Sequence, residues 1–193
     1  MTTSNVLYES SFVWMQDLQP GQRNLLKAMI DFFPENIKNG VDIGCGDGKI
    51  TQRLIDATKI PLSGIDVSEE ALSRCQFQTY HSKAESLPFT DDEYDMVLST
   101  DVLEHLPQDK EKKAWNELFR VAKKTVMLAV PFRENLLDAV ARCPNCNHTY
   151  HVNWHMRSYD WRDLLARTPK GWKATKIILS GEPWSPYHPL ETA

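Results

Sequence analysis

The chain has 193 residues, which fits one domain, and its composition is that of an ordinary globular protein. The 22 Lys and Arg against 26 Asp and Glu give a formal net charge of -4, which argues against a nucleic-acid-binding protein. No apolar run approaches the ~20 residues of a membrane helix, and the first residues lack the pattern of a signal peptide. We therefore expect a cytoplasmic domain without membrane contact, whose Cys residues are free thiols or metal ligands.

Strand-like and helix-like segments alternate along the chain, which predicts a mostly parallel sheet with helices on both faces. Apolar residues at helical spacing predict helices over 22–33, 49–57 and 108–122, and Ser158 is expected to begin a short one. Ser68 is the expected N-cap of a further helix, with Glu69 and Glu70 in its first turn. The expected strands cover residues 41–43, 61–67, 77–82, 95–99, 124–130 and 173–180. The Pro-rich tail from 181 should be a surface extension.

The segment VDIGCGDGKIT places Gly44, Gly46 and Gly48 between a predicted strand and a predicted helix. Glycines at such a turn let the backbone approach a ligand closely. Asp66 ends the next strand, about 20 residues on, where an acid would accept hydrogen bonds from ribose hydroxyls. The spacing is G-x-G-x-G, and Asp42 and Asp47 would repel a pyrophosphate but suit a ligand with a sulfonium and an ammonium group. A glycine turn without a ligand is the alternative.

Three runs in order, VDIGCGDG, GIDVSEEAL and AESLPFTDDEYDMVLSTDVLEHL, resemble the class I S-adenosylmethionine (SAM)-dependent methyltransferases. The likeness is strongest to the small-molecule branch that includes the ubiquinone-biosynthesis type, and it covers about residues 20–130. It implies a Rossmann-like α/β fold and a single methyltransferase domain over 1–193. An N-terminal helical lid over about 1–35 would carry Tyr8, Phe12 and Trp14.

The end of the chain departs from the family pattern. The family usually closes its sheet with an antiparallel sixth and seventh strand, whereas only 13 residues follow the expected sixth strand here. We therefore predict six strands with a shortened or missing seventh. A partner subunit, as in a homodimer, would cover the open edge.

The resemblance also implies the residues that bind SAM, and all of them lie at or after the carboxyl ends of predicted strands. Asp66 would hold the ribose hydroxyls, and His105 would be the general base because it titrates near neutrality. Alternatively, His105 and Glu104 only buttress the turn after the fourth strand. The other implied positions are the methionine end (Asp42, Gly44, Cys45, Gly46), the adenine (Val67, Ala84, Glu85) and the sulfonium side (Thr100, Asp101, Val102).

The acceptor is harder to predict, because methyl transfer mainly needs alignment of the nucleophile, the methyl group and the sulfur. After the fourth strand the chain reads STDVLEHL, without the Asn/Asp-Pro-Pro-aromatic run or the Pro-Cys nucleophile of nucleobase enzymes. We predict methyl transfer to a small-molecule acceptor with an O, N or C nucleophile, in a biosynthetic or sugar-modifying pathway. A protein or RNA methyltransferase and a non-catalytic SAM-binding regulatory subunit are the alternatives.

A loop insert over about 142–157 contains Cys143, Cys146, His151 and His155 at the spacing C-x2-C-x4-H-x3-H. Four N and S ligands are the set that closes a tetrahedral structural zinc site. His148 is a substitute ligand, and a similar loop in some family members extends the resemblance to this segment. The alternative is a loop with two reduced cysteines and unrelated histidines.

Overall fold

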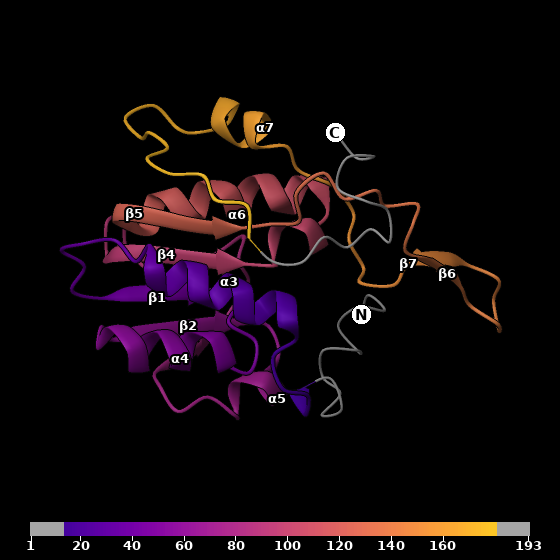
Figure 1. Cartoon of the computed structure of the whole chain (residues 1–193), viewed down its shortest axis with the longest axis horizontal. Coiled ribbons are helices and arrows are strands. Elements are labelled where there is room, and N and C mark those ends of the chain that lie inside the picture. The colour runs from indigo at the N-terminus through magenta and orange to yellow at the C-terminus, as the bar shows by residue number, and fades with distance from the viewer. Residues whose placement is uncertain (1–13, 181–193) are drawn as a thin grey trace.

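A computed structural model describes residues 14–180, so Tyr8, Phe12 and the tail from 181 lie outside the described residues. Its centre is a parallel sheet of five strands in the order β3-β2-β1-β4-β5 (Figure 1). The strands are β1 (Gly40–Ile43), β2 (Leu62–Asp66), β3 (Thr79–His81), β4 (Tyr94–Thr100) and β5 (Ala122–Ala129). The strand order reverses between β1 and β4, which is where open α/β sheets bind ligands.

Helices cover both faces of this sheet, as the alternating pattern predicts (Figure 1). On one face, α3 (Pro20–Asp31) and α4 (Lys49–Thr58) contribute Leu26 and Leu54 to a core that includes Met96 of β4. On the other face, α6 (Gln108–Val121) contributes Leu118 to a core that includes Val97 of β4. Neighbouring residues of β4 thus point to opposite cores, so the two helical layers bury the central strand completely.

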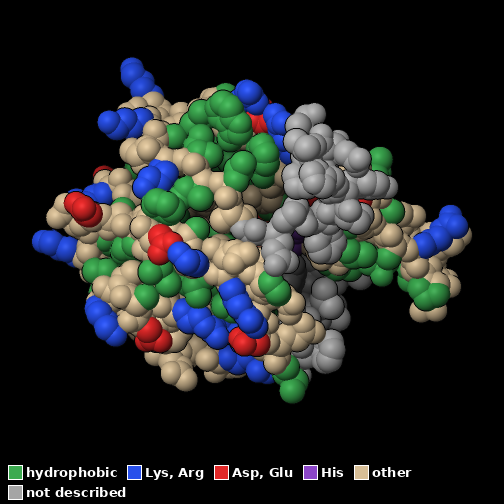
Figure 2. Space-filling view, in the orientation of Figure 1, with side chains coloured by type: hydrophobic (Ala, Val, Ile, Leu, Met, Phe, Trp, Pro, Cys, Tyr) green, Lys and Arg blue, Asp and Glu red, His purple; other side chains and the backbone are tan. Residues whose placement is uncertain are grey.

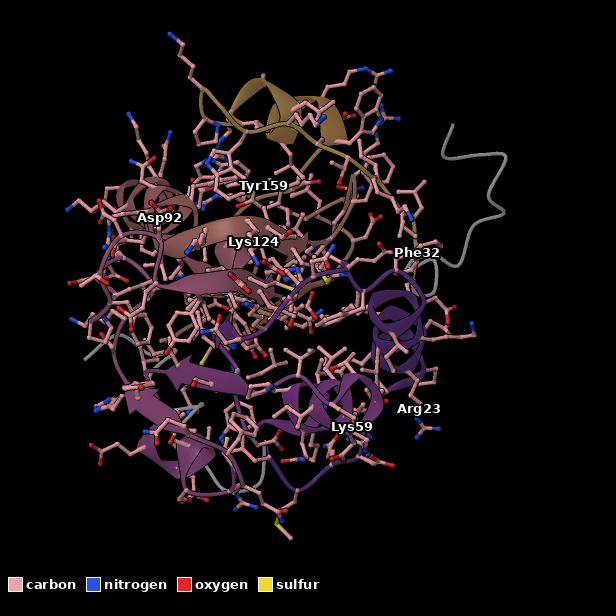
Figure 3. The ribbon with its side chains drawn as sticks, turned by 90° about the vertical axis from the view of Figure 1, so that its left-hand side faces the viewer. Arg23, Phe32, Lys59, Asp92, Lys124 and Tyr159 are labelled. Atoms are coloured by element: carbon pink, nitrogen blue, oxygen red, sulfur yellow. The ribbon has the colours of Figure 1, made fainter. Side chains whose placement is uncertain are left out.

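Two of the short helical elements follow the carboxyl ends of strands of the sheet, and a third follows the insert. Helix α5 (Glu69–Leu72) begins at the predicted N-cap, because the Ser68 side chain accepts a hydrogen bond from Ala71 N. A 3-10 turn, η1 (Leu103–His105), follows β4. Helix α7 (Trp161–Ala166) begins after Asp160, and Figure 3 shows Tyr159 between α7 and the sheet. Among residues 14–180, no helix is long and apolar enough to cross a membrane.

The sixth strand expected over 173–180 is not formed, and β5 is the edge of the sheet. Residues 172–180 have no regular secondary structure, and Ile177, Ile178 and Leu179 are all exposed. Consecutive apolar residues are typical of a strand buried on both faces. No described helix or strand packs over this segment on the side away from the sheet. Its apolar residues therefore cannot be buried on both faces, as they would be in an inner strand.

The insert forms structure that the sequence pattern did not predict. Strands β6 (Val140–Arg142) and β7 (Thr149–His151) pair as an antiparallel hairpin in which Arg142 faces Thr149 and Val140 faces His151. The hairpin stands away from the body on the side of the carboxyl ends of the sheet strands (Figures 1 and 2). Its base therefore lies at the ligand-binding edge, whereas its tip does not.

Candidate functional site

The glycine turn after β1 is held by backbone hydrogen bonds. Gly44 N and Cys45 N both donate to Ile65 O, at 2.7 and 2.9 Å, which ties the turn to the end of β2. Gly44, Gly46 and Gly48 have φ values of +79°, +54° and +73°, in the left-handed region that favours glycine. The predicted glycines are thus required by the backbone path of this turn.

Two of these glycines are also places of close approach. A Cβ on Gly44 would lie 2.3 Å from Val102 Cγ2, and one on Gly46 would lie 2.9 Å from the Trp14 ring. Lys49 Nζ donates to Trp14 O at 2.7 Å, which fixes Trp14 beside the turn. This contact fits the lid hypothesis, and the lid itself stays a prediction.

Asp66 lies at the end of β2, as the ribose assignment requires. Its Oδ2 accepts from Gly46 N and its Oδ1 from Ser68 N, both at 2.9 Å. Each carboxylate oxygen has two lone pairs, so the group can also accept from ribose hydroxyls. The neighbouring Val67 is 43% exposed, which leaves an apolar surface where an adenine ring would pack.

Asp42 is buried in β1 beneath the turn. Thr51 Oγ1 donates to its Oδ2 at 2.6 Å, while its Oδ1 has no hydrogen-bond partner among the described residues. Burial raises the pKa of Asp42 to about 6, although the Thr51 hydrogen bond opposes the shift. A buried carboxylate oxygen without a partner is costly, and a cationic ammonium group is a donor that would satisfy it. This orphaned oxygen and the glycine cradle fit the methionine end of SAM.

The remaining predicted SAM residues differ in what they offer a ligand. The Cys45 Sγ packs against Gly64 and lies 3.6 Å from Gly46 O, so it faces the fold. Ala84 belongs to the core, and Glu85 pairs with Lys110 Nζ at 3.4 Å. Thr100 is buried at the end of β4, whereas Asp101 beyond it is exposed. The structure therefore brings the methionine and ribose positions together more clearly than the adenine positions.

The turn η1 after β4 carries two buried titratable groups. Glu104 is fully buried, neither oxygen has a hydrogen-bond partner among the described residues, and burial raises its pKa to about 8. Burial, together with the neighbouring His155, lowers the pKa of His105 to about 4. At neutral pH His105 is therefore an uncharged and weak base, which counts against its predicted role.

The four predicted zinc ligands are not brought together. Cys143 and Cys146 lie in the turn at the tip of the hairpin, where Cys143 N donates to His148 O. His151 and His155 lie at its base, with their rings stacked at 4.9 Å. Within residues 14–180, two groups of three ligand-type side chains have ligand atoms within 4.8 Å of one another, and neither includes a Cys. The hairpin separates the two pairs because its strands run between tip and base.

The sequence did not point to Glu134, which the structure places between these histidines. Its Oε2 lies 2.5 Å from His155 Nδ1 and its Oε1 lies 3.5 Å from His151 Nε2. The only signal in the sequence was an acid in the irregular stretch after β5, at the ligand-binding edge of the sheet. An isolated acid in a loop carries no pattern, so its role depends on tertiary contacts.

Comparisons with known proteins agree with this geometry. Residues 41–130 match a family model described as a methyltransferase domain. A curated relative, 27-O-demethylrifamycin SV methyltransferase of Amycolatopsis mediterranei, is 30% identical over 78 residues, which are 35% of this chain and 29% of the relative. The family-model match over residues 41–130 includes the glycine turn, Asp66 and the end of β4.

Solved structures extend the likeness in fold. A SAM-dependent methyltransferase from Methanosarcina mazei has a TM-score of 0.57 at 23% identity, over 78% of this chain and 82% of that one. A SAM-dependent methyltransferase from Thermotoga maritima has a TM-score of 0.51 at 25% identity, over 61% of this chain and 55% of that one. The chain spans 29% and 41% of the lengths of the two curated relatives that it matches.

Proposed function

We propose that this chain is an enzyme that transfers the methyl group of SAM to a small-molecule acceptor with an O, N or C nucleophile. The observation that carries the proposal is the cradle at the β1–β4 switch point. There Gly44 and Gly46 leave no room for a side chain, and the Asp66 carboxylate is fixed beside them. The methyltransferase-domain match over 41–130 supports the same cofactor.

In this proposal the residues of the chain bind and align the two substrates. Asp42 and the backbone of Gly44, Cys45 and Gly46 hold the methionine end, and Asp66 holds the ribose. Val67, Ala84 and Glu85 line the adenine, and the sulfonium lies beside the residues after β4 (Thr100, Asp101, Val102). When bound, SAM supplies an activated methyl group on a positively charged sulfur.

The acceptor class rests on two supporting observations. The relative from Amycolatopsis is named for methylation of 27-O-demethylrifamycin SV, which makes an oxygen nucleophile on a small molecule a reasonable first test. The residues beside the expected methyl position are acidic and imidazole groups rather than a basic surface.

Equilibrium dialysis with labelled SAM tests the cofactor site. Asp66→Ala should weaken SAM binding by at least tenfold, about 1.4 kcal/mol, because ribose hydrogen bonds are lost. Asp56→Ala, on the exposed side of α4, is the matched control and should bind like wild type. Thermal melting of both variants shows whether the fold survives, and wild-type protein that does not bind SAM would contradict the proposal.

The acceptor class is tested by transfer of label from SAM into a cell lysate separated into small molecules, RNA and protein. Label in the small-molecule fraction is the expected result. Label only in protein or RNA would favour a macromolecular acceptor. Binding of SAM without any transfer would favour a regulatory subunit.

A further inference from the structure

A cluster of imidazoles and carboxylates gathers where β4 ends, from two segments far apart in the chain. Glu104 and His105 come from η1, and Glu134, His151 and His155 come from the insert. The His105 and His155 rings meet edge to face with centroids 4.8 Å apart. We call these five residues the His/Glu cluster.

The insert is fixed to η1 by its backbone as well as by its side chains. Met156 N donates to Glu104 O at 2.8 Å, and Arg157 Nη1 donates to Leu103 O at 3.0 Å. These bonds come from the two residues that follow His155, and they hold this part of the chain against η1, at the carboxyl edge of the sheet. Asp101, beside the expected methyl position, is close enough to interact electrostatically with His155 and Glu134.

The short contact with Glu134 decides which ring nitrogen of His155 carries the proton. At 2.5 Å, Nδ1–H donates to Glu134 Oε2, and both side chains are at most 10% exposed. A carboxylate accepts only, so Nδ1 must be the protonated nitrogen. Nε2 then keeps its lone pair, and it has no hydrogen-bond partner among the described residues.

His151 is held in the opposite tautomer. Its Nδ1 accepts from Asn153 N and His155 N, both at 3.3 Å, so its Nε2 carries the hydrogen. This buried nitrogen lies 3.5 Å from Glu134 Oε1 and has no hydrogen-bond partner among the described residues. Glu134 thus lies between two imidazoles, and the hydrogen bond that it accepts comes from His155.

We propose that His155, positioned by Glu134, accepts the proton of the methyl acceptor's hydroxyl group during transfer. This inference rests on the proposed function. The acceptor oxygen forms a bond to the methyl carbon, and the C–S bond breaks with its electron pair going to sulfur. The O–H proton moves to His155 Nε2, and the resulting imidazolium is stabilised by the Glu134 carboxylate until solvent removes the proton.

The test measures initial rates with saturating labelled SAM and the small-molecule lysate fraction as acceptor. His155→Ala should lower the rate about 100-fold, the low end for loss of a general base, while SAM affinity stays at the wild-type value. Added imidazole should restore part of this rate, which a purely structural defect would not allow. His148→Ala, an exposed histidine at the hairpin tip, is the matched control and should be fully active.

Glu134→Gln tests the positioning role, because the amide keeps the shape but loses the charge. The rate should fall about tenfold, and 15N NMR should show His155 protonated at Nδ1 in the wild type but as a mixture of tautomers in the variant. A wild-type rate in His155→Ala, or an Nε2–H tautomer in the wild type, would overturn the proposal. Loss of activity in EDTA with recovery in Zn²⁺ would overturn it too. Failure of wild-type protein to bind SAM would contradict the proposed function itself. The results above contradict only the role of His155, because SAM binding and methyl transfer would remain.

Discussion

The glycine turn and the insert meet at the same edge of the sheet, but they are stabilised in different ways. The turn is held by backbone N–H groups of residues 44–48 that bond to Ile65 O, Cys45 O and the Asp66 carboxylate. The insert has backbone bonds too, such as Met156 N to Glu104 O, but it also depends on side chains. Arg157 bonds to Leu103 O of η1, and Glu134 lies between two histidines. A site held by its backbone tolerates few changes, whereas one held by side chains can change with a few substitutions. The glycine turn, on the cofactor side of the site, should therefore be rigid. The insert, on the acceptor side, should be more easily changed by substitution.

The largest effect is expected in the glycine turn. Gly44→Val forces a β-branched residue into the left-handed region and against Val102, so the free energy of unfolding should fall by roughly 2–5 kcal/mol. Urea denaturation measures this loss. Gly171→Val is the control, because its φ is also positive but a Cβ there would meet nothing within 4 Å. Equal losses in the two variants would show that contact with Val102 does not matter.

In the His/Glu cluster, we expect a stability effect that depends on pH. Glu104 has a pKa of about 8 in the folded protein, against an ordinary value of 4.5. Between pH 4.5 and pH 8, Glu104 is therefore protonated in the folded state but ionised in the unfolded state. Stability therefore falls as the pH rises through this window. His105, with a pKa lowered from 6.5 to about 4, has the opposite effect, because stability is lost as the pH falls from 6.5 to 4. Above pH 6.5 only the Glu104 effect remains.

Glu104→Gln cannot ionise, so it should gain stability over wild type by on the order of 3 kcal/mol at pH 8 and by much less at pH 5. Melting curves from pH 5 to 8 measure the difference. Glu35→Gln, at an exposed position, should show no such dependence. A Glu104→Gln variant that parallels wild type at every pH would mean that Glu104 is already ionised in the fold.

A smaller effect is expected where the insert joins α6. The buried Tyr159 hydroxyl donates to Glu111 Oε1 at 3.1 Å, and Arg167 keeps a second bond to the same oxygen. Tyr159→Phe should cost about 1–2 kcal/mol of unfolding free energy, the value of a hydrogen bond to a charged group. Tyr150→Phe removes a hydroxyl without a hydrogen bond among the described residues, so urea denaturation should show little change. A Tyr159→Phe variant as stable as Tyr150→Phe would contradict this role.

The smallest effect is expected at the hairpin tip. Because Cys143 and Cys146 lie apart from the histidines, Cys143→Ser should change the free energy of unfolding by no more than the ±0.5 kcal/mol of an ordinary surface substitution. Metal analysis of the purified protein provides the second measurement. One zinc per chain in wild type, lost together with stability in Cys143→Ser, would show that the four-ligand hypothesis is right.

The sequence alone determined the features that depend on short-range backbone geometry. The glycine turn, the N-cap at Ser68 and the position of Asp66 at the end of β2 all follow from residues close together in the chain, and the structure has each of them. The alternation of elements likewise predicted the parallel sheet and both helical layers. Local conformational preferences and hydrophobic periodicity decide these features, and both can be read from a sequence.

Only the tertiary structure decided what the insert and the edge of the sheet do. The spacing of Cys143, Cys146, His151 and His155 suits one metal ion, but the pairing of β6 with β7 separates tip from base. The contact of Glu134 with His155 joins residues 21 positions apart, without a pattern that announces it. Likewise, the apolar run at 177–179 has no covering layer and forms no strand. Such contacts depend on how packed elements meet in space, and residue spacing along the chain does not encode that.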